Sequence, residues 1–431
     1  MSSHYNSHSH LGITVNLDGT VNRQVQFPKI EPNPDPITGN LTVSKDVILN
    51  PKHKTSVRVF RPVKLPSNDN TVARLPIIIY LHGGGFVLYS AADALSHHNC
   101  AQMASDIPAI VVSVDYRLAP EHKLPACYED AVDAILWVRD QALDPEGEPW
   151  LKSFGDFTRC YLSGRGNGAN AVFHATSRAL DLDLGPLKIA GLIYNQALFG
   201  GVQRTKSEIK FAADHLLPLP VLDALWDLAL PRGADRDHRF SNPMIDGPHK
   251  SKIGSLPRSL VIGFNGDPLI DRQQEFLQML ALAGVQVEAQ FDDVGISGVS
   301  RSGHLGWVQN RDFLTLDFTI FDAWHGGSCN SVVRKPTEHR MFNVAPDQLP
   351  HDVRLRAQLR ESVDLGAASV HGSDVAVAKD DLSLSDDCCF SRSTSEKRGR
   401  EMNRGKRERE RGREKRVAGV LMFSGVDLDQ C

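Results

Sequence analysis

Short apolar runs alternate with amphipathic segments over most of the first 300 residues. The apolar runs show no alternation of polar and apolar positions, which is typical of strands buried on both faces of a parallel sheet. They occupy residues 76–81, 109–114, 160–163, 190–194 and 259–263. Helical patterns lie between them, over residues 92–105, 129–141, 169–180 and 272–282. Strands that alternate with helices predict a doubly wound α/β fold, whose functional loops follow the carboxyl ends of the strands.

Two segments interrupt this alternation. The segment 201–243 is rich in Leu, Trp and Pro and has a helical pattern, so we expect it to form a cap over the edge of the sheet. Residues 1–40 are assigned to the same cap. They contain a hairpin signal at Asp18-Gly19 and a Pro-rich loop over 28–36. The remaining expected elements are strands at 42–49, 56–60 and 285–291 and a last helix at 308–324.

Beyond residue 328 the composition changes. Residues 362–387 are polar and mostly acidic in their charges, and residues 397–416 are almost entirely Arg, Lys, Glu and Gly. Such a composition cannot bury enough apolar surface to offset the entropy that is lost on ordering. We therefore predict one domain over residues 1–328 and a low-complexity, disordered tail over residues 329–431. The basic run also resembles RNA-binding segments and nuclear signals, but its interleaved Glu residues favour a solvated tail.

The composition argues against some classes of binding partner and favours one cellular compartment. The formal net charge of −4 argues against nucleic acid or an acidic membrane as the main partner. No apolar run approaches the roughly 20 residues that span a bilayer, and residues 1–10 lack the apolar core of a signal peptide. The seven Cys residues are scattered, without His or Cys partners at metal-ligand spacing. We therefore expect a cytoplasmic protein, with a nuclear location as the alternative, and neither a metal nor a cofactor.

A glycine run, His82-Gly83-Gly84-Gly85, directly follows the predicted strand at 76–81. Glycines in this place let backbone N–H groups point into a cleft and donate to an oxyanion. A plain glycine turn would show the same letters, so the motif alone leaves both interpretations open.

The segment 162–169 stands between a predicted strand and a predicted helix, where a nucleophile elbow of the pattern Gly-x-Ser-x-Gly would lie. Gly164 and Gly168 are present, but the central residue is Gly166. Because glycine adopts the strained conformation of an elbow at little cost, the turn can persist without a nucleophile. We expect the neighbouring Ser163 to belong to the strand rather than to replace the missing serine. The same glycines also fit a loose dinucleotide-binding pattern, but that motif normally follows the first strand of its unit.

Candidates for an acid and a base follow in chain order. Asp267 lies after the apolar run 259–263, where a carboxylate could orient a catalytic His. A helix N-cap is the structural alternative in this segment and suits Asp271. His304 is the one histidine in the loop after residues 285–291. The order nucleophile, acid, His is that of serine hydrolases built on an α/β sheet.

Four groups of residues resemble motifs of the plant carboxylesterase family, in the hormone-sensitive-lipase-like branch of the α/β-hydrolases. They are His82-Gly83-Gly84-Gly85-Phe86, Asp115-Tyr116-Arg117-Leu118-Ala119-Pro120-Glu121-His122, Leu124-Pro125-Ala126 with Tyr128-Glu129-Asp130, and Asp267-Pro268-Leu269-Ile270-Asp271-Arg272. The resemblance covers about residues 11–324. It implies an α/β-hydrolase fold, with a central, mostly parallel sheet flanked by helices and a helical cap. The family includes soluble plant esterases and the gibberellin receptor, which resembles an esterase that gave up hydrolysis to bind a small hormone.

The resemblance also assigns site positions. Four positions keep a residue that can perform the family's role. Gly83, Gly84 and Asn167 match the oxyanion-hole donors, and Asp267 matches the triad acid. Gly166 stands where the family has the nucleophilic Ser, and Ser297 stands on the family's His position. His304 could take the place of that His only if residues 296–302 are an insertion that loops out.

Three interpretations of function follow. The first is a catalytically impaired esterase homologue, whose ancestral reaction is the hydrolysis of small carboxylic esters and whose cleft still binds a small ester; its alternative form is a non-catalytic binder of a hormone-like ligand. The second is a residual hydrolase or lyase that works without a serine nucleophile, through His304 and a water molecule. The third is a degenerate chain, since residues 296–302 and the tail resemble translated non-coding text. No feature of the sequence specifies an oligomeric state.

Overall fold

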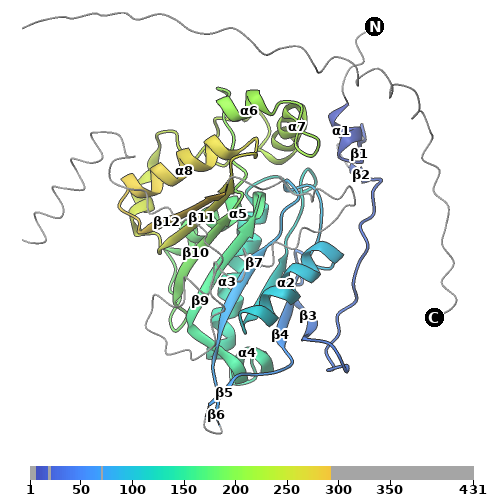
Figure 1. The fold of residues 1–431 in the computed structure, drawn as a ribbon, viewed down its shortest axis with the longest axis vertical. Helices are drawn as coiled ribbons and strands as arrows, with labels where there is room; N and C mark the ends of the chain where they lie inside the picture. The colour runs from blue at the N-terminus through green and yellow to red at the C-terminus, as the bar shows by residue number, and fades with distance from the viewer. Residues whose placement is uncertain (1–5, 18–20, 69–70, 293–431) are drawn as a thin grey trace, which may run out of the picture. The chain divides into compact units, whose positions relative to one another are not determined.

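An eight-stranded sheet organises the protein (Figure 1). The computed structural model describes residues 6–17, 21–68 and 71–292. In the order in which they pair, the strands are β12 (Val287–Asp292), β11 (Ser259–Phe264), β10 (Ile189–Asn195), β9 (Gly155–Arg165), β7 (Leu75–Leu81), β8 (Ile110–Asp115), β4 (Thr55–Pro62) and β3 (Thr42–Asn50). The first six of these pair in parallel, whereas β4 and β3 are antiparallel. The predicted, mostly parallel sheet is therefore confirmed.

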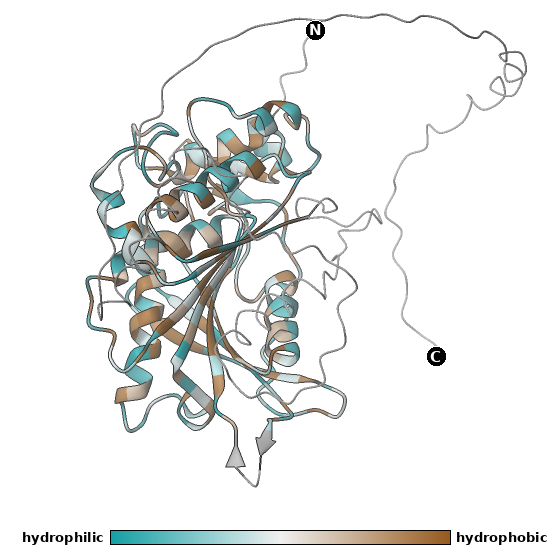
Figure 2. Ribbon diagram, turned by 60° about the vertical axis from the view of Figure 1, so that its left-hand side comes forward, coloured by the Kyte–Doolittle hydropathy of each residue, from teal (hydrophilic) through white to brown (hydrophobic). Residues whose placement is uncertain are grey.

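The central strands are apolar throughout because helices cover both faces of the sheet. Every residue of β7 and of β11 is buried, and Figure 2 shows the middle of the sheet as a band of hydrophobic residues. Successive side chains of a strand point to opposite faces. A strand buried on both faces therefore has few polar positions, which explains the mainly apolar runs in the sequence.

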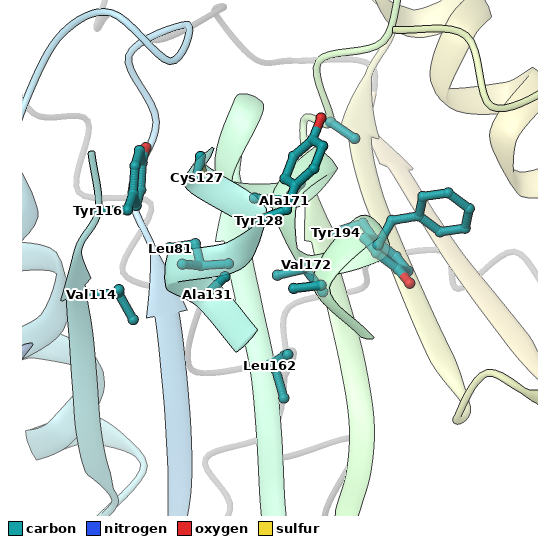
Figure 3. Packing of buried hydrophobic residues seen from close by; sticks show 14 of the residues in the cluster. Leu81, Val114, Tyr116, Cys127, Tyr128, Ala131, Leu162, Ala171, Val172 and Tyr194 are labelled. Atoms are coloured by element: carbon teal, nitrogen blue, oxygen red, sulfur yellow. The ribbon is translucent and has the colours of Figure 1, made fainter. Parts of the chain in front are cut away.

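The five main helices lie on the two faces of the sheet. They are α2 (Ala94–Asp106), α3 (Ala126–Leu143), α4 (Pro149–Phe154), α5 (Asn167–Ala179) and α8 (Ile270–Leu282). Met103 of α2 packs in one cluster with Ile78 and Tyr80 of β7. Leu81, the residue after Tyr80, belongs to the other cluster, together with Ala131 of α3 (Figure 3). The helices predicted at 92–105, 129–141, 169–180 and 272–282 are confirmed within a few residues, whereas α4 was not foreseen.

A cap lies against the loops that follow the parallel strands. It contains α6 (Lys206–Lys210) and α7 (Leu219–Ala229), and α1 (Ser7–His10) contacts α7. The three helices lie together in Figure 1. Nε2 of His10 is 3.3 Å from the carbonyl oxygen of Leu216, which joins the N-terminal segment to the segment before α7. The helical character predicted for 201–243 is confirmed.

Smaller elements complete the described part of the chain. They are the antiparallel pair β1 (Ile13–Val15) and β2 (Val21–Arg23), the short pair β5 (Ser67–Asn68) and β6 (Thr71–Val72), and the 3₁₀ helix η1 (Pro248–Ser255). The pairing of β1 with β2 agrees with the predicted hairpin. Its turn at Asp18-Gly19, the helix at 308–324, the boundary at 328 and the tail at 329–431 lie outside the described residues. Among the helices described, none combines the length and the apolar character needed to cross a bilayer.

Candidate functional site: a nucleophile elbow without a nucleophile

Gly166 occupies the sharp turn between β9 and α5. Its backbone angles are φ 59° and ψ −120°, a conformation that residues with a side chain rarely adopt. Its N–H donates to the carbonyl oxygen of Asn195 at 2.9 Å, and its own carbonyl oxygen accepts from the N–H of Leu198 at 2.9 Å. The strand–turn–helix geometry of an elbow is therefore present, while the central residue has no side chain that can attack a carbonyl carbon.

The other glycines of this turn are required by close packing. A Cβ atom on Gly164 would lie 2.3 Å from the backbone of Gly168, and a Cβ on Gly168 would lie 2.0 Å from the carbonyl oxygen of Leu81. A Cβ on Gly166, by contrast, would meet no atom of the described residues within 4 Å. The turn thus excludes a side chain at its two flanking glycines but leaves open space at its centre.

The glycine run after β7 lies beside this elbow. A Cβ on Gly83 would lie 3.2 Å from the carbonyl oxygen of Arg165, the last residue of β9. Gly84 and Gly85 have φ values of 113° and 65°, which favour glycine. A Cβ on Gly85 would approach Leu225 of α7 to 2.5 Å, so the cap packs directly on the glycine run.

The N–H groups of the glycine run are not equivalent. The N–H of Gly85 donates to Oδ1 of Asn167 at 2.8 Å. Within residues 6–17, 21–68 and 71–292, the N–H groups of Gly83 and Gly84 donate to no protein acceptor. Gly83 and Gly84, the expected oxyanion donors, therefore keep N–H groups that a ligand can use, whereas Gly85 does not.

Asp267 follows β11 and is 1% exposed. Its Oδ1 accepts from the N–H of Leu269 at 2.9 Å, and its Oδ2 accepts from Nε2 of Gln273 at 3.0 Å. Burial raises the pKa of this carboxyl to about 6, although both hydrogen bonds act in the opposite direction. Because β9 and β11 both run parallel to β10 between them, Gly166 and Asp267 lie at the same edge of the sheet.

The alternative of a helix cap at Asp271 is wrong in detail. The N-cap of α8 is Leu269, and Asp271 lies inside the first turn of that helix. Oδ2 of Asp271 accepts from the N–H of Ser207 at 2.8 Å, which joins the cap helix α6 to α8. The cap is therefore bonded to the first turn of α8, the helix that begins just after the acid position.

Replacing Asp267 by Asn is expected to stabilise the protein at neutral pH. The unfolded carboxyl titrates near 3.8 and the folded one near 6, so the folded state resists ionisation and wild-type stability falls as the pH rises from about 4 to about 6. The shift of roughly two units corresponds to about 3 kcal/mol at pH 7. Among the described residues, Oε1 of Gln273 has no hydrogen-bond partner, so that amide can turn over and accept from the new Asn.

Thermal unfolding of wild type and Asp267→Asn between pH 4 and pH 8 checks this expectation. The difference in melting temperature should be small at pH 4, grow up to about pH 6.5 and then stay level. Asp246→Asn is the matched control because Asp246 is exposed, and it should show no such growth. A wild type that is more stable than Asp267→Asn at pH 7 would contradict the expectation.

Of the three remaining candidate residues, the structure describes only Ser163. Ser163 lies inside β9, paired with Tyr80 and Ile193, and is 1% exposed. It therefore belongs to the strand, as expected, and does not replace the nucleophile. Ser297 and His304 lie outside the described residues.

Sequence spacing did not reveal one group of possible metal ligands. Ligand atoms of His53, Asp130 and Asp133 lie within 4.8 Å of one another. However, Asp130 is fully buried and accepts from the backbone N–H of Arg117 at 2.8 Å and from its guanidinium at 2.9 Å. Because its oxygens are already occupied, the group is an ion-pair network and not a candidate metal centre.

A surface cavity of about 630 Å³ was also not foreseen. It lies between the N-terminal segment and the loops after β7 and β8, and its lining includes Phe27, Tyr89, Leu118 and His122. The rings of Phe27 and Tyr89 are 4.4 Å apart. Its size is that of cavities that hold small organic molecules. Its walls come from segments about 60 to 90 residues apart in the chain, so spacing could not indicate it.

Comparison with known proteins gives a consistent result. A family model described as α/β-hydrolase fold matches residues 78–295. Probable carboxylesterase 9 of Arabidopsis thaliana is 54% identical over 296 residues, which cover 68% of this chain and 91% of the relative. A gibberellin receptor of Oryza sativa subsp. japonica is 36% identical over 234 residues, covering 53% and 63%. A hyperthermophilic esterase from the archaeon Pyrobaculum calidifontis superposes with a TM-score of 0.53 at 25% identity, covering 65% and 83%.

Proposed function

The chain belongs to the carboxylesterase family of the α/β-hydrolase fold, and on that premise we propose that it binds a small carboxylic ester or a hormone-like ligand while its hydrolytic activity is severely impaired. The observation that carries the proposal is Gly166, which has the backbone angles of an elbow and no nucleophile. Loss of a triad nucleophile typically lowers turnover by about 10⁶-fold, and the oxyanion hole and binding leave only a residual enhancement.

Retention of a binding site is supported by the residues around the elbow. The glycine run keeps the N–H groups of Gly83 and Gly84 unengaged among described residues, and α7 packs on the same loop. A pure binder of a hormone-like molecule is the alternative form of the proposal, favoured by the similarity to a gibberellin receptor.

We expect the ligand to be a small molecule. We expect the protein itself to be in a reducing compartment of the cell. Cys100, Cys127 and Cys160 are all buried free thiols, which supports a cytoplasmic location, with the nucleus as the alternative. Burial raises the pKa of each of these thiols, so they remain protonated and unreactive at neutral pH.

Isothermal titration calorimetry tests the proposal. We expect at least one member of a panel of short-chain esters, the corresponding carboxylic acids and gibberellins to bind with a Kd on the order of 1–100 µM. Leu225→Ala removes the side chain that covers the glycine run and should weaken binding about tenfold. Leu282→Ala is the control because Leu282 is exposed on α8, and it should leave binding unchanged. Absence of binding to the whole panel by folded protein would count against the proposal.

A further inference from the structure

A buried hydrogen-bond network joins the elbow helix to the glycine run. Asn167, the first residue of α5, is fully buried. Its Oδ1 accepts from the N–H of Gly85 at 2.8 Å, and its Nδ2 donates to the phenolic oxygen of Tyr116 at 3.0 Å. Because a backbone N–H can only donate, the orientation of the Asn167 amide is fixed by its partners.

Tyr116 carries the network on to His82. The Tyr116 hydroxyl donates to the carbonyl oxygen of His82 at 2.7 Å, and Nδ1 of His82 lies 3.1 Å from the same hydroxyl. Nδ1 of His82 also lies 2.7 Å from the carbonyl oxygen of Gly83. Burial lowers the pKa of His82, so the imidazole is neutral and its Nδ1–H is the donor in this arrangement. The two rings stack with their centroids 4.2 Å apart.

These contacts restrain three consecutive peptide groups. The carbonyl oxygen of His82 is held by Tyr116, and the carbonyl oxygen of Gly83 is held by the His82 ring. In a trans peptide the N–H points opposite to the C=O. The N–H groups of Gly83 and Gly84 are therefore both turned away from the side chains that hold the carbonyls.

The third peptide group is restrained at both of its ends. The carbonyl oxygen of Gly84 accepts from the N–H groups of Val87 and Leu88, at 3.2 and 3.0 Å. The N–H of Gly85, in the same peptide group, donates to Asn167. Glycines rotate freely about their backbone bonds. A run of three would be mobile without such anchors, and Asn167 is the anchor that connects it to the elbow.

We propose that Asn167 is a positioning residue whose side-chain amide, bonded to Gly85 and Tyr116, holds the glycine run so that the N–H groups of Gly83 and Gly84 converge on one ligand atom. The role of these two N–H groups rests on the proposed function, whereas the restraint of the loop does not. The backbone N–H of Asn167 is separate from this role and is unchanged by substitution of the side chain.

Hydrogen exchange measured by mass spectrometry on the full chain tests the restraint. In Asn167→Ala, exchange in the peptide fragment 82–88 should be accelerated roughly tenfold or more. In Asn167→Asp we expect burial to keep the new carboxyl protonated. Its C=O and O–H then replace both hydrogen bonds of the amide, and exchange should stay near that of wild type. Asn170→Ala is the matched control. Asn170 is a second buried amide on α5, bonded to Tyr128, Leu198 and Phe240.

The control should lower the melting temperature but leave exchange in fragment 82–88 unchanged. Unchanged exchange in Asn167→Ala, or equal acceleration in Asn170→Ala, would overturn the proposal, because the loop would then be held by something else or would respond to any loosening of α5. In an enzyme repaired at the nucleophile and the base, Asn167→Ala should lower kcat about 10- to 100-fold with little change in KM. If the repaired enzyme is inactive, the assignment of the triad positions fails; if the calorimetric panel shows no binding, the proposed function fails. In either case the exchange experiment still decides the role of Asn167.

Discussion

The double variant Gly166→Ser with Ser297→His is expected to hydrolyse p-nitrophenyl acetate at least roughly 10³-fold faster than wild type. It supplies a serine at the turn and a histidine at the position where the sequence analysis expects the triad His, and loss of a triad nucleophile typically costs about 10⁶-fold. The elbow can receive the serine, since a Cβ at position 166 meets no atom within 4 Å in the part of the chain that the structure describes. The remaining cost is the backbone strain at φ 59°, about 1–3 kcal/mol, which natural elbows also bear. Asp267 already lies at the same edge of the sheet.

The variant Gly166→Ser alone tests whether the serine needs the added histidine. Gly166→Ser alone should give little activity, because a serine without a general base is a weak nucleophile at neutral pH. If Gly166→Ser alone matches the double variant, then His304 is the working base and the assignment of Ser297 to the His position is wrong. Asp267→Ala in the double variant should remove most of the recovered activity, and persistence of that activity would show that it arises elsewhere.

Gly168→Ala is expected to be far more destabilising than Gly166→Ala, although the two glycines are two residues apart in one turn. A methyl group on Gly168 would lie 2.0 Å from the carbonyl oxygen of Leu81 and 2.7 Å from that of His82. Both are backbone atoms at the end of β7, so relief requires α5 and β7 to separate. We expect a loss of more than about 3 kcal/mol, at or above the usual cost of overpacking. Gly166→Ala carries only the backbone strain of about 1–2 kcal/mol.

Thermal unfolding followed by circular dichroism measures the difference. For a domain of this size a loss of 3 kcal/mol lowers the melting temperature by roughly 6–12 °C, and the loss in Gly166→Ala should be about half of that or less. Gly233→Ala is a further control, because Gly233 has φ 80° and open space around it, so it carries strain without a clash. Equal melting temperatures for Gly166→Ala and Gly168→Ala would mean that α5 does not pack against the end of β7 as described.

Several parts of the site follow from local sequence. The vacant nucleophile is visible because the elbow pattern is contiguous, and Gly164 and Gly168 mark the turn whatever stands between them. Asp267 was found because it follows an apolar run, and the carboxyl ends of parallel strands meet at one edge of the sheet. Such features depend on residues that are neighbours in the chain, or on a rule that holds for every parallel sheet.

Other parts depend on contacts between distant segments. The sequence marked Asn167 only for its backbone N–H, whereas its side chain bonds to Gly85 and Tyr116, which are 82 and 51 residues away. The role of Asp271 was misassigned for the same reason, because its partner Ser207 belongs to the cap, 64 residues earlier. No local pattern specifies which polar groups meet once the helices have packed.

The sequence by itself determined the α/β architecture, the cap segment at 201–243 and the absence of a serine at position 166, because each is recorded in periodicity or in a contiguous motif. The tertiary structure alone decided that Gly166 keeps the backbone of an elbow and that Asp267 is buried with a raised pKa. It alone also decided that the glycine run is hydrogen-bonded to the side chains of Tyr116 and Asn167. Those properties come from burial and from the mutual orientation of peptide groups. Both arise only when the ends of several strands are brought to one edge of the sheet.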